Sequence, residues 1–139
     1  MMNKHDLHCK AIAEDLRKYN DGCYISYNGD TYEIDDLETV EIDGYEYYVI
    51  DGENVDPDET EILSLYDYFD DYYNIDWILD SNKELQAVRV MVACGGPNIY
   101  INTWDKQVEL FWWTDSGKYY LDNDLCNAIN SIFEEYWNM

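Results

Sequence analysis

The sequence predicts an α+β fold, with an antiparallel sheet built from hairpins and a meander and about three helices in the order α-ββββ-α-ββββ-α. Three observations predict it. Apolar residues recur at helical spacing near both ends and in the middle of the chain. The dipeptides Asn28-Gly29 and Asp43-Gly44 separate short alternating stretches. Four more strand-like stretches follow Ile75. With 139 residues, the chain is expected to form one domain, residues 1–139.

A first helix is expected over residues 5–19. Its apolar stripe and its stop signal are both present: Leu7, Ala11, Ile12, Leu16 and Tyr19 recur at helical spacing, and Asn20-Asp21-Gly22 follows.

Two hairpins follow this helix. Residues 24–27 and 31–34 flank the first glycine turn, and residues 38–42 and 45–50 flank the second. Asn-Gly and Asp-Gly favour the positive backbone angles of tight hairpin turns, so both pairs of strands are expected to be antiparallel.

A polar loop over residues 51–57 and a second helix over residues 58–73 are expected next. Pro57 and the acidic residues beside it suit a helix start, because the helix dipole favours negative charge there. The expected apolar stripe comprises Ile62, Leu65, Tyr66, Phe69 and Tyr73.

The remaining residues predict four successive strands and a final helix. The strands are expected at 75–79, 85–94, 98–103 and 107–113, with the second in the interior of the sheet because Val88, Val90, Val92 and Cys94 share one side. The helix is expected to begin at residues 122–124 and to bury Leu125, Ile129, Ile132, Phe133 and Tyr136.

Charge divides the chain into two halves. No lysine or arginine occurs between Lys18 and Lys83, whereas twenty aspartates and glutamates do. Residues 84–139 hold eight acids, three bases and four of the five tryptophans. Residues 84–139 are therefore expected to be a scaffold of sheet and helix, and residues 21–80 an acidic half that the scaffold presents.

The acids alternate with apolar residues as in folded strands, so the acidic half is expected to be ordered. An ordered body with so much charge of one sign repels itself, which favours a strongly basic partner. Duplex DNA carries one charge per about 1.7 Å, so twenty carboxylates match roughly ten base pairs. Residues two apart on a strand share a face and lie about 6.6 Å apart, which is the expected spacing of Glu33 from Asp35 and of Glu41 from Asp43. The residues expected to bind the partner are Glu33, Asp35, Asp36, Glu38, Glu41, Asp43, Glu46, Asp51, Glu53, Asp56, Asp58, Glu59, Asp67, Asp70 and Asp71.

Aromatic residues suggest further contacts. Seven tyrosines alternate with the acids: Tyr45, Tyr47, Tyr48, Tyr66, Tyr68, Tyr72 and Tyr73. Such side chains could anchor an interface or stack on arginine, and about half of the seven are expected in the core instead. Trp112 and Trp113 are adjacent on a strand and so point to opposite sides. At least one is expected at the surface, as a second contact or a homodimer interface.

The sequence favours no catalytic chemistry. His5, His8 and Cys9 have no second ligand pair at metal spacing, so no metal site is expected. The glycine-rich run 95–98 joins two strands and is expected to be a turn and not a phosphate loop. The acidic run 51–59 lacks the register of an EF-hand, although calcium there is an open alternative. Neither an enzyme nor a cofactor is expected.

Composition also limits the partners and the compartment. A formal net charge of -23 disfavours direct binding to nucleic acid or to anionic membranes. The four cysteines form no CxxC pair and are expected to be free thiols. The first residues lack the apolar core of a signal peptide, so the expected location is the cytoplasm.

In size and in its base-free acidic stretch from Asp21 to Asp80, the chain resembles the small acidic anti-defence proteins of phages and mobile elements. These are the anti-CRISPR and antirestriction proteins that act as nucleic-acid mimics. The resemblance covers about half of the chain. It implies a stoichiometric inhibitor that occupies the DNA- or RNA-binding channel of a CRISPR nuclease or another defence nuclease, where phosphate-clamping or base-reading arginines would meet the carboxylates.

Two other functions remain open at the level of the sequence. An immunity protein that neutralises a basic nuclease toxin would need similar electrostatics. A small-ligand binder or an enzyme would instead need a concave apolar pocket near residues 95–98 and the tryptophans.

Overall fold

A computed structural model describes residues 1–139, and the chain divides into two compact units. The acidic unit is Lys18–Ser64, and the sheet–helix unit comprises Met1–Arg17 and Leu65–Met139. Three α-helices and exclusively antiparallel strand pairs make the fold α+β, as the sequence predicts. The expectation of one domain stays a prediction, because two compact units can still fold as one cooperative domain.

The sheet–helix unit is built on a five-stranded sheet in the order β11-β10-β9-β8-β7. Its strands are β7 Asn74–Leu79, β8 Leu85–Ala93, β9 Asn98–Asn102, β10 Gln107–Trp112 and β11 Asp115–Tyr120. The four predicted strands are confirmed as β7 to β10, and β8 is interior. The sequence prediction missed β11, an edge strand whose first four residues, Asp115 to Lys118, are polar or glycine.

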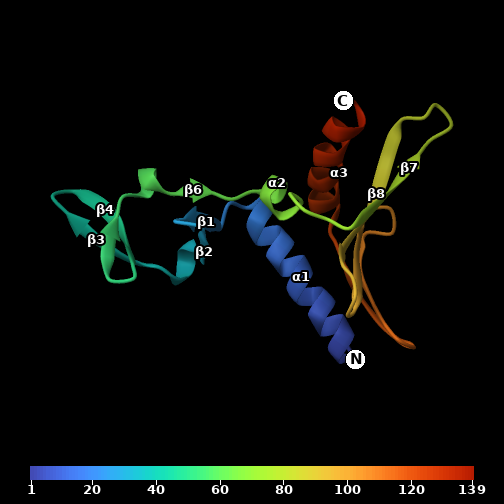
Figure 1. Cartoon of the computed structure of the whole chain (residues 1–139), viewed down its shortest axis with the longest axis horizontal. Helices are drawn as coiled ribbons and strands as arrows, with labels where there is room; N and C mark the ends of the chain where they lie inside the picture. The colour runs from blue at the N-terminus through green and yellow to red at the C-terminus, as the bar shows by residue number, and fades with distance from the viewer. The chain divides into compact units, whose positions relative to one another are not determined.

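Helices α1 (Lys4–Asn20) and α3 (Asn123–Trp137) lie on the same side of this sheet (Figure 1). Strand alternation directs Val88, Val90, Ile101 and Val108 to one face, and all four are fully buried. The core is therefore the layer between the helices and this face.

Helix α1 begins within one residue of its predicted start, but its buried face differs from the predicted stripe. Leu7 and Ala11 are exposed, whereas Cys9, Ala13 and Leu16 are buried. The helix approaches β11 so closely that a Cβ on Gly117 would lie 2.4 Å from the carbonyl carbon of His5. Cys9, Ala13 and Leu16 recur at helical spacing and share one face of the helix, whereas Leu7 lies on the opposite face.

Helix α3 confirms the final predicted helix. The Asp122 carboxylate caps it by accepting a hydrogen bond from the Leu125 backbone N–H at 2.8 Å. Phe133 is fully buried and contacts the rings of Phe69, Tyr72 and Trp77 edge-on. Tyr136, which was expected to be buried, is exposed at the end of the helix.

The acidic unit contains two three-stranded sheets. One has the order β2-β1-β6 and the other β3-β4-β5. The strands are β1 Tyr24–Tyr27, β2 Asp30–Glu33, β3 Glu38–Ile42, β4 Tyr45–Ile50, β5 Glu53–Val55 and β6 Glu61–Ile62, with 3₁₀ turns η1 Ile34–Asp36 and η2 Pro57–Glu59. Both predicted hairpins are present, and β5 lies within the predicted loop.

The predicted helix over residues 58–73 is wrong. The chain instead forms the short strand β6 and a single helical turn, α2 (Leu65–Tyr68). Ile62 pairs with Ile25 in the first sheet. Leu65 and Phe69 are buried, while Ile62, Tyr66 and Tyr73 of the expected stripe are exposed. Leu65 and Phe69 lie four residues apart, so a single helical turn is enough to bury both side chains. The residues before them form a strand because they pair with β1.

Candidate acidic partner-binding surface

The acidic unit holds its charges on ordered backbone. Ile25 in the first sheet and Ile50 and Val55 in the second are almost fully buried. Asn28 and Asp43 adopt φ of 51° and 53°, and each precedes a glycine at 84°, as the two hairpin turns require. Carboxylates on these strands and turns are therefore positioned by hydrogen-bonded pairs and not by a flexible tail.

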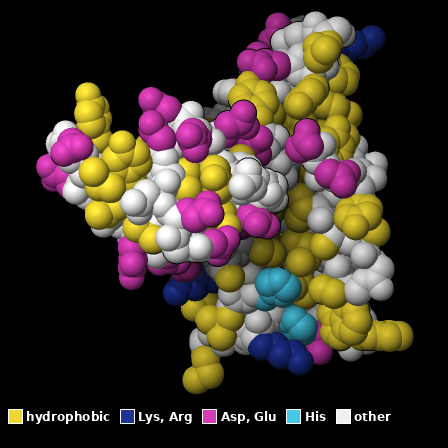
Figure 2. All heavy atoms as spheres, turned by 60° about the vertical axis from the view of Figure 1, so that its left-hand side comes forward, with side chains coloured by type: hydrophobic (Ala, Val, Ile, Leu, Met, Phe, Trp, Pro, Cys, Tyr) yellow, Lys and Arg dark blue, Asp and Glu magenta, His cyan; other side chains and the backbone are white.

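Nearly every carboxylate of the acidic unit is exposed. The unit has fifteen carboxylates and one base, Lys18, which leaves a formal charge of -14. Fourteen of the carboxylates are exposed, and the exception is Glu33. In the space-filling view, magenta acidic side chains are scattered among yellow hydrophobic ones on this part of the surface (Figure 2). The charge is thus available to a partner.

Glu33 is half-buried because it is paired within the unit. Its carboxylate lies 2.6 Å from the Lys18 ammonium. That hydrogen bond holds the pKa of Glu33 below its usual value. The neighbouring Glu33 carboxylate in turn raises the pKa of Asp36, by hydrogen bonding and by repulsion. Among the predicted partner-binding residues, Glu33 is therefore the one already neutralised by the chain's own base.

The 6.6 Å spacing was predicted on the assumption that both residues of each carboxylate pair lie on one strand, and this assumption is wrong. Asp35 lies in the 3₁₀ turn η1, so Glu33 and Asp35 are not two apart on a strand. Asp43 occupies the hairpin turn after Glu41, where the backbone angle φ is positive. Regular phosphate-like spacing along a strand is thus absent from both pairs, although all the residues except Glu33 are exposed.

A closer pair of acids lies across the second hairpin. Glu41 of β3 is directly opposite Glu46 of β4. Directly opposite side chains have Cβ atoms about 5 Å apart, and like charges at this separation repel. Neither carboxylate makes an ion pair with a base of this chain. A cation from a partner would relieve this repulsion.

The other predicted residues of the acidic unit lie at strand ends and turns. Glu38 begins β3, Asp51 precedes Gly52 in a turn, and Glu53 begins β5. Asp58 and Glu59 lie in η2, and Asp56 caps this turn by accepting a hydrogen bond from the Asp58 backbone N–H at 3.0 Å. Asp56 therefore has a structural role besides its charge.

Three predicted residues belong to the sheet–helix unit instead. Asp67 lies in α2, and Asp70 and Asp71 follow it before β7; all three are exposed. The structure therefore groups twelve of the predicted carboxylates in one unit and these three in the other.

The sequence prediction missed an uncovered apolar face on the β3-β4-β5 sheet. The register pairs Ile42 with Tyr45, Val40 with Tyr47 and Glu38 with Val49, so these side chains share one face. None of them is fully buried: Tyr45 is 71% and Ile42 42% exposed, Val40, Tyr47 and Val49 are half-buried, and Glu38 is the one charged residue on this face. The signal was the alternation of apolar residues on both sides of Asp43-Gly44, which indicates the face but not whether anything covers it.

Exposed aromatic residues also mark the sheet–helix unit. Trp113, at the turn between β10 and β11, has φ of 55° and is 89% exposed. The Trp112 ring packs edge-on against that of Trp113, with 6.0 Å between the ring centroids, and Trp112 is itself exposed. The expectation that at least one of the two tryptophans is exposed is confirmed. The prediction that they point to opposite sides of one strand is wrong, because Trp113 lies in the turn after β10.

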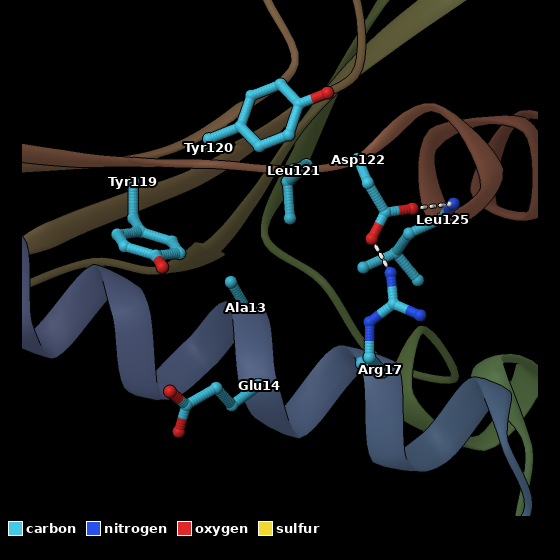
Figure 3. A pocket seen from close by; sticks show the side chains of 8 residues that line it. All are labelled: Ala13, Glu14, Arg17, Tyr119, Tyr120, Leu121, Asp122 and Leu125. Carbon is cyan, nitrogen blue, oxygen red and sulfur yellow. Dashed lines mark hydrogen bonds and ion pairs between the residues drawn. The ribbon is translucent and has the colours of Figure 1, made fainter.

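A hollow of about 250 Å³ lies between α1, the end of β11 and the start of α3 (Figure 3). The Arg17 guanidinium points at the Asp122 carboxylate and forms an ion pair with it. The second Asp122 oxygen receives the helix-capping hydrogen bond, so both charged groups are used to join α1 to α3. The residues of this junction line the hollow together with Tyr119 and Tyr120, and the Tyr119 ring points toward α1 (Figure 3).

The first helix has no reactive thiol at neutral pH. Burial raises the pKa of the Cys9 thiol to about 11, with smaller contributions from Asp6 and Glu109. His5 lies 3.9 Å from the Asp115 carboxylate. No group of three or more His, Cys, Asp or Glu side chains is arranged to hold a metal ion. The run 95–98 joins β8 to β9, as predicted for a turn.

Comparison of this chain with known protein families, with characterised proteins and with solved structures found no significant match. The structure has no helix with the length and the apolar character that crossing a membrane requires.

Proposed function

We propose that this protein is a stoichiometric inhibitor that presents the acidic unit to the basic DNA- or RNA-binding channel of a CRISPR nuclease or another defence nuclease in the bacterial cytoplasm. One observation carries the proposal. Fourteen of the fifteen carboxylates in Lys18–Ser64 are exposed on ordered strands and turns, against a single base that is already paired.

The electrostatics support a basic partner and not a neutral one. A unit of 47 residues with a formal charge of -14 repels itself, and neutral contacts would leave that repulsion in place. Arginines and lysines that hold phosphates would meet carboxylates instead, with charge-assisted hydrogen bonds. Occupying the channel requires no chemistry from the inhibitor, so the proposal includes neither catalysis nor a cofactor.

The test is a gel-shift assay in which purified protein competes with duplex DNA for guide-loaded CRISPR nucleases across a salt series. We expect inhibition at about one inhibitor per nuclease and weaker inhibition as salt rises, because both charged surfaces are screened. Replacing Asp51, Glu53, Asp58 and Glu59 together by Asn or Gln should weaken it further. Full inhibition by this neutralised variant would overturn the proposal.

A second candidate is an immunity protein that neutralises a basic nuclease toxin. The 71% exposure of Tyr45 beside carboxylates favours it, because exposed tyrosines anchor tight protein interfaces. Co-expression with basic nuclease toxins in bacteria distinguishes the two. Rescue of growth, together with no inhibition of guide-loaded nucleases, would select the immunity function.

A further inference from the structure

The outer edge of β3 is unpaired. β3 is the terminal strand of the β3-β4-β5 sheet, and its residues pair only with β4. In an antiparallel ladder, every second residue directs its N–H and C=O away from its partner strand. These outward groups of β3 form no backbone hydrogen bond elsewhere in the chain. They are therefore a ready template for a strand from another molecule.

The two faces beside this edge differ in chemistry. Val40 and Ile42 of β3 lie on the uncovered apolar face with Tyr45 and Tyr47 of β4, and Glu38 lies on this face at the start of β3. Thr39 and Glu41 lie on the opposite face, where Glu41 is directly across from Glu46. A strand added to β3 would continue both faces, because its side chains alternate in the same way.

We propose that β3 is the docking edge for an extended segment of the basic partner in which apolar and basic residues alternate. The apolar side chains of that segment would extend the face of Val40 and Ile42. Its arginines or lysines would lie on the face of Glu41 and Glu46 and relieve the repulsion between them. This inference rests on the proposed function and adds to it a specific site and recognition by backbone hydrogen bonds.

Charge decides between this occupant and others. A second copy would bring another unit with a formal charge of -14 to the same edge and would leave Glu41 and Glu46 without a cation, so charge disfavours self-association at β3. An uncharged apolar strand would satisfy one face and leave the Glu41–Glu46 repulsion in place. An alternating basic strand suits both faces and the edge.

The probes are two synthetic decapeptides of identical composition, five arginines and five valines, each fluorescently labelled. One alternates arginine with valine, and the other carries the arginines and valines as two blocks. Anisotropy titrations with the full chain at 0.15 M salt compare their affinities. We expect the alternating peptide to bind about tenfold more tightly, because only it can match both faces while paired to β3. Protection from hydrogen exchange should appear at the outward amides of β3.

Two pairs of variants separate the site from general attraction. Glu41→Gln with Glu46→Gln should weaken binding of the alternating peptide about tenfold and leave binding of the block peptide within about twofold. The control is Asp21→Asn with Asp30→Asn, which removes the same charge from exposed sites outside the β3-β4-β5 sheet. It should weaken both peptides equally and by about twofold at most.

The outcomes distinguish this inference from the proposed function. Equal binding of the two peptides, or equal effects of the two variant pairs, would overturn the β3 site and leave capture by charge intact. No binding of either peptide above that of a serine–valine peptide would overturn both. Tighter binding of the alternating peptide without protection at β3 would place the site elsewhere and also overturn the inference.

Discussion

Asn3 and Asp6 close the first turn of α1 and tie it to β11. The Asp6 backbone N–H donates to the Asn3 side-chain oxygen at 2.8 Å, and the Asn3 backbone N–H donates to the Asp6 carboxylate at 2.9 Å. The other Asp6 oxygen accepts a hydrogen bond from the Lys118 backbone N–H at 2.9 Å. One carboxylate thus stabilises both the helix end and its attachment to the sheet.

These hydrogen bonds give a pH-dependent prediction. The Lys118 N–H, and next the Asn3 N–H, hold the pKa of Asp6 below its usual value. A lowered folded-state pKa means that the stabilisation is complete above the unfolded value and is lost as pH falls through the folded value. We expect Asp6→Asn to lower Tm at pH 6 and the difference from the wild type to shrink towards pH 2, measured by circular dichroism. A difference that grows on acidification would contradict this assignment.

Gly117 permits the close approach of α1 to β11. A Cβ there would meet the backbone of His5 and Asp6 at 2.4–2.6 Å, and backbone cannot move aside as a flexible side chain can. We expect Gly117→Ala to destabilise the protein by about 1–3 kcal/mol in urea unfolding, as other overpacked sites do. Ser116→Ala, at the exposed neighbouring position of the same strand, is the control and should change stability by less than about 0.5 kcal/mol.

At the scale of elements, the β3–β4 hairpin carries an internal repulsion that a single substitution can reverse. Glu46→Lys would convert the like-charged pair with Glu41 into an opposite-charged one. We expect a stability gain of about 0.2–1 kcal/mol in urea unfolding, with weaker inhibition of the target nuclease.

Glu38→Lys is the matched control for this hairpin. It changes the net charge equally and lies on the same hairpin, but Glu38 is opposite Val49 and has no acidic partner across the strands. Lowering the negative charge of the unit should stabilise both variants. The additional stability gain of Glu46→Lys over Glu38→Lys therefore measures the contribution of the cross-strand pair. Equal gains would show that this pair contributes nothing of its own.

At the scale of the whole molecule, a net charge of -23 makes salt act in opposite directions on folding and on binding. The Debye length falls from about 30 Å at 0.01 M to about 3 Å at 1 M salt, which screens the repulsion among carboxylates. We expect Tm to rise with NaCl while inhibition weakens. The variant with Asp51, Glu53, Asp58 and Glu59 neutralised should show a smaller rise, and a Tm that falls with salt in both proteins would contradict the electrostatic account.

Local signals in the sequence predicted the elements they control directly. Asn28-Gly29 and Asp43-Gly44 require positive φ, and both hairpins formed around them. Long apolar repeats predicted α1 and α3, because helix periodicity persists over several turns. The prediction of a helix over residues 58–73 failed because the apolar stripe there is short, and because pairing of Ile62 with Ile25 outweighs helix propensity.

The sequence by itself determined the α+β class, the two hairpins, the terminal helices and the base-free acidic stretch. These follow from nearest-neighbour backbone preferences, from periodicity and from composition. Only the tertiary structure decided which faces are covered. The buried side of α1 depends on its contact with Gly117, and the open edge of β3 and its apolar face depend on which strands pair. Such contacts join residues far apart in the chain, and no local pattern encodes them.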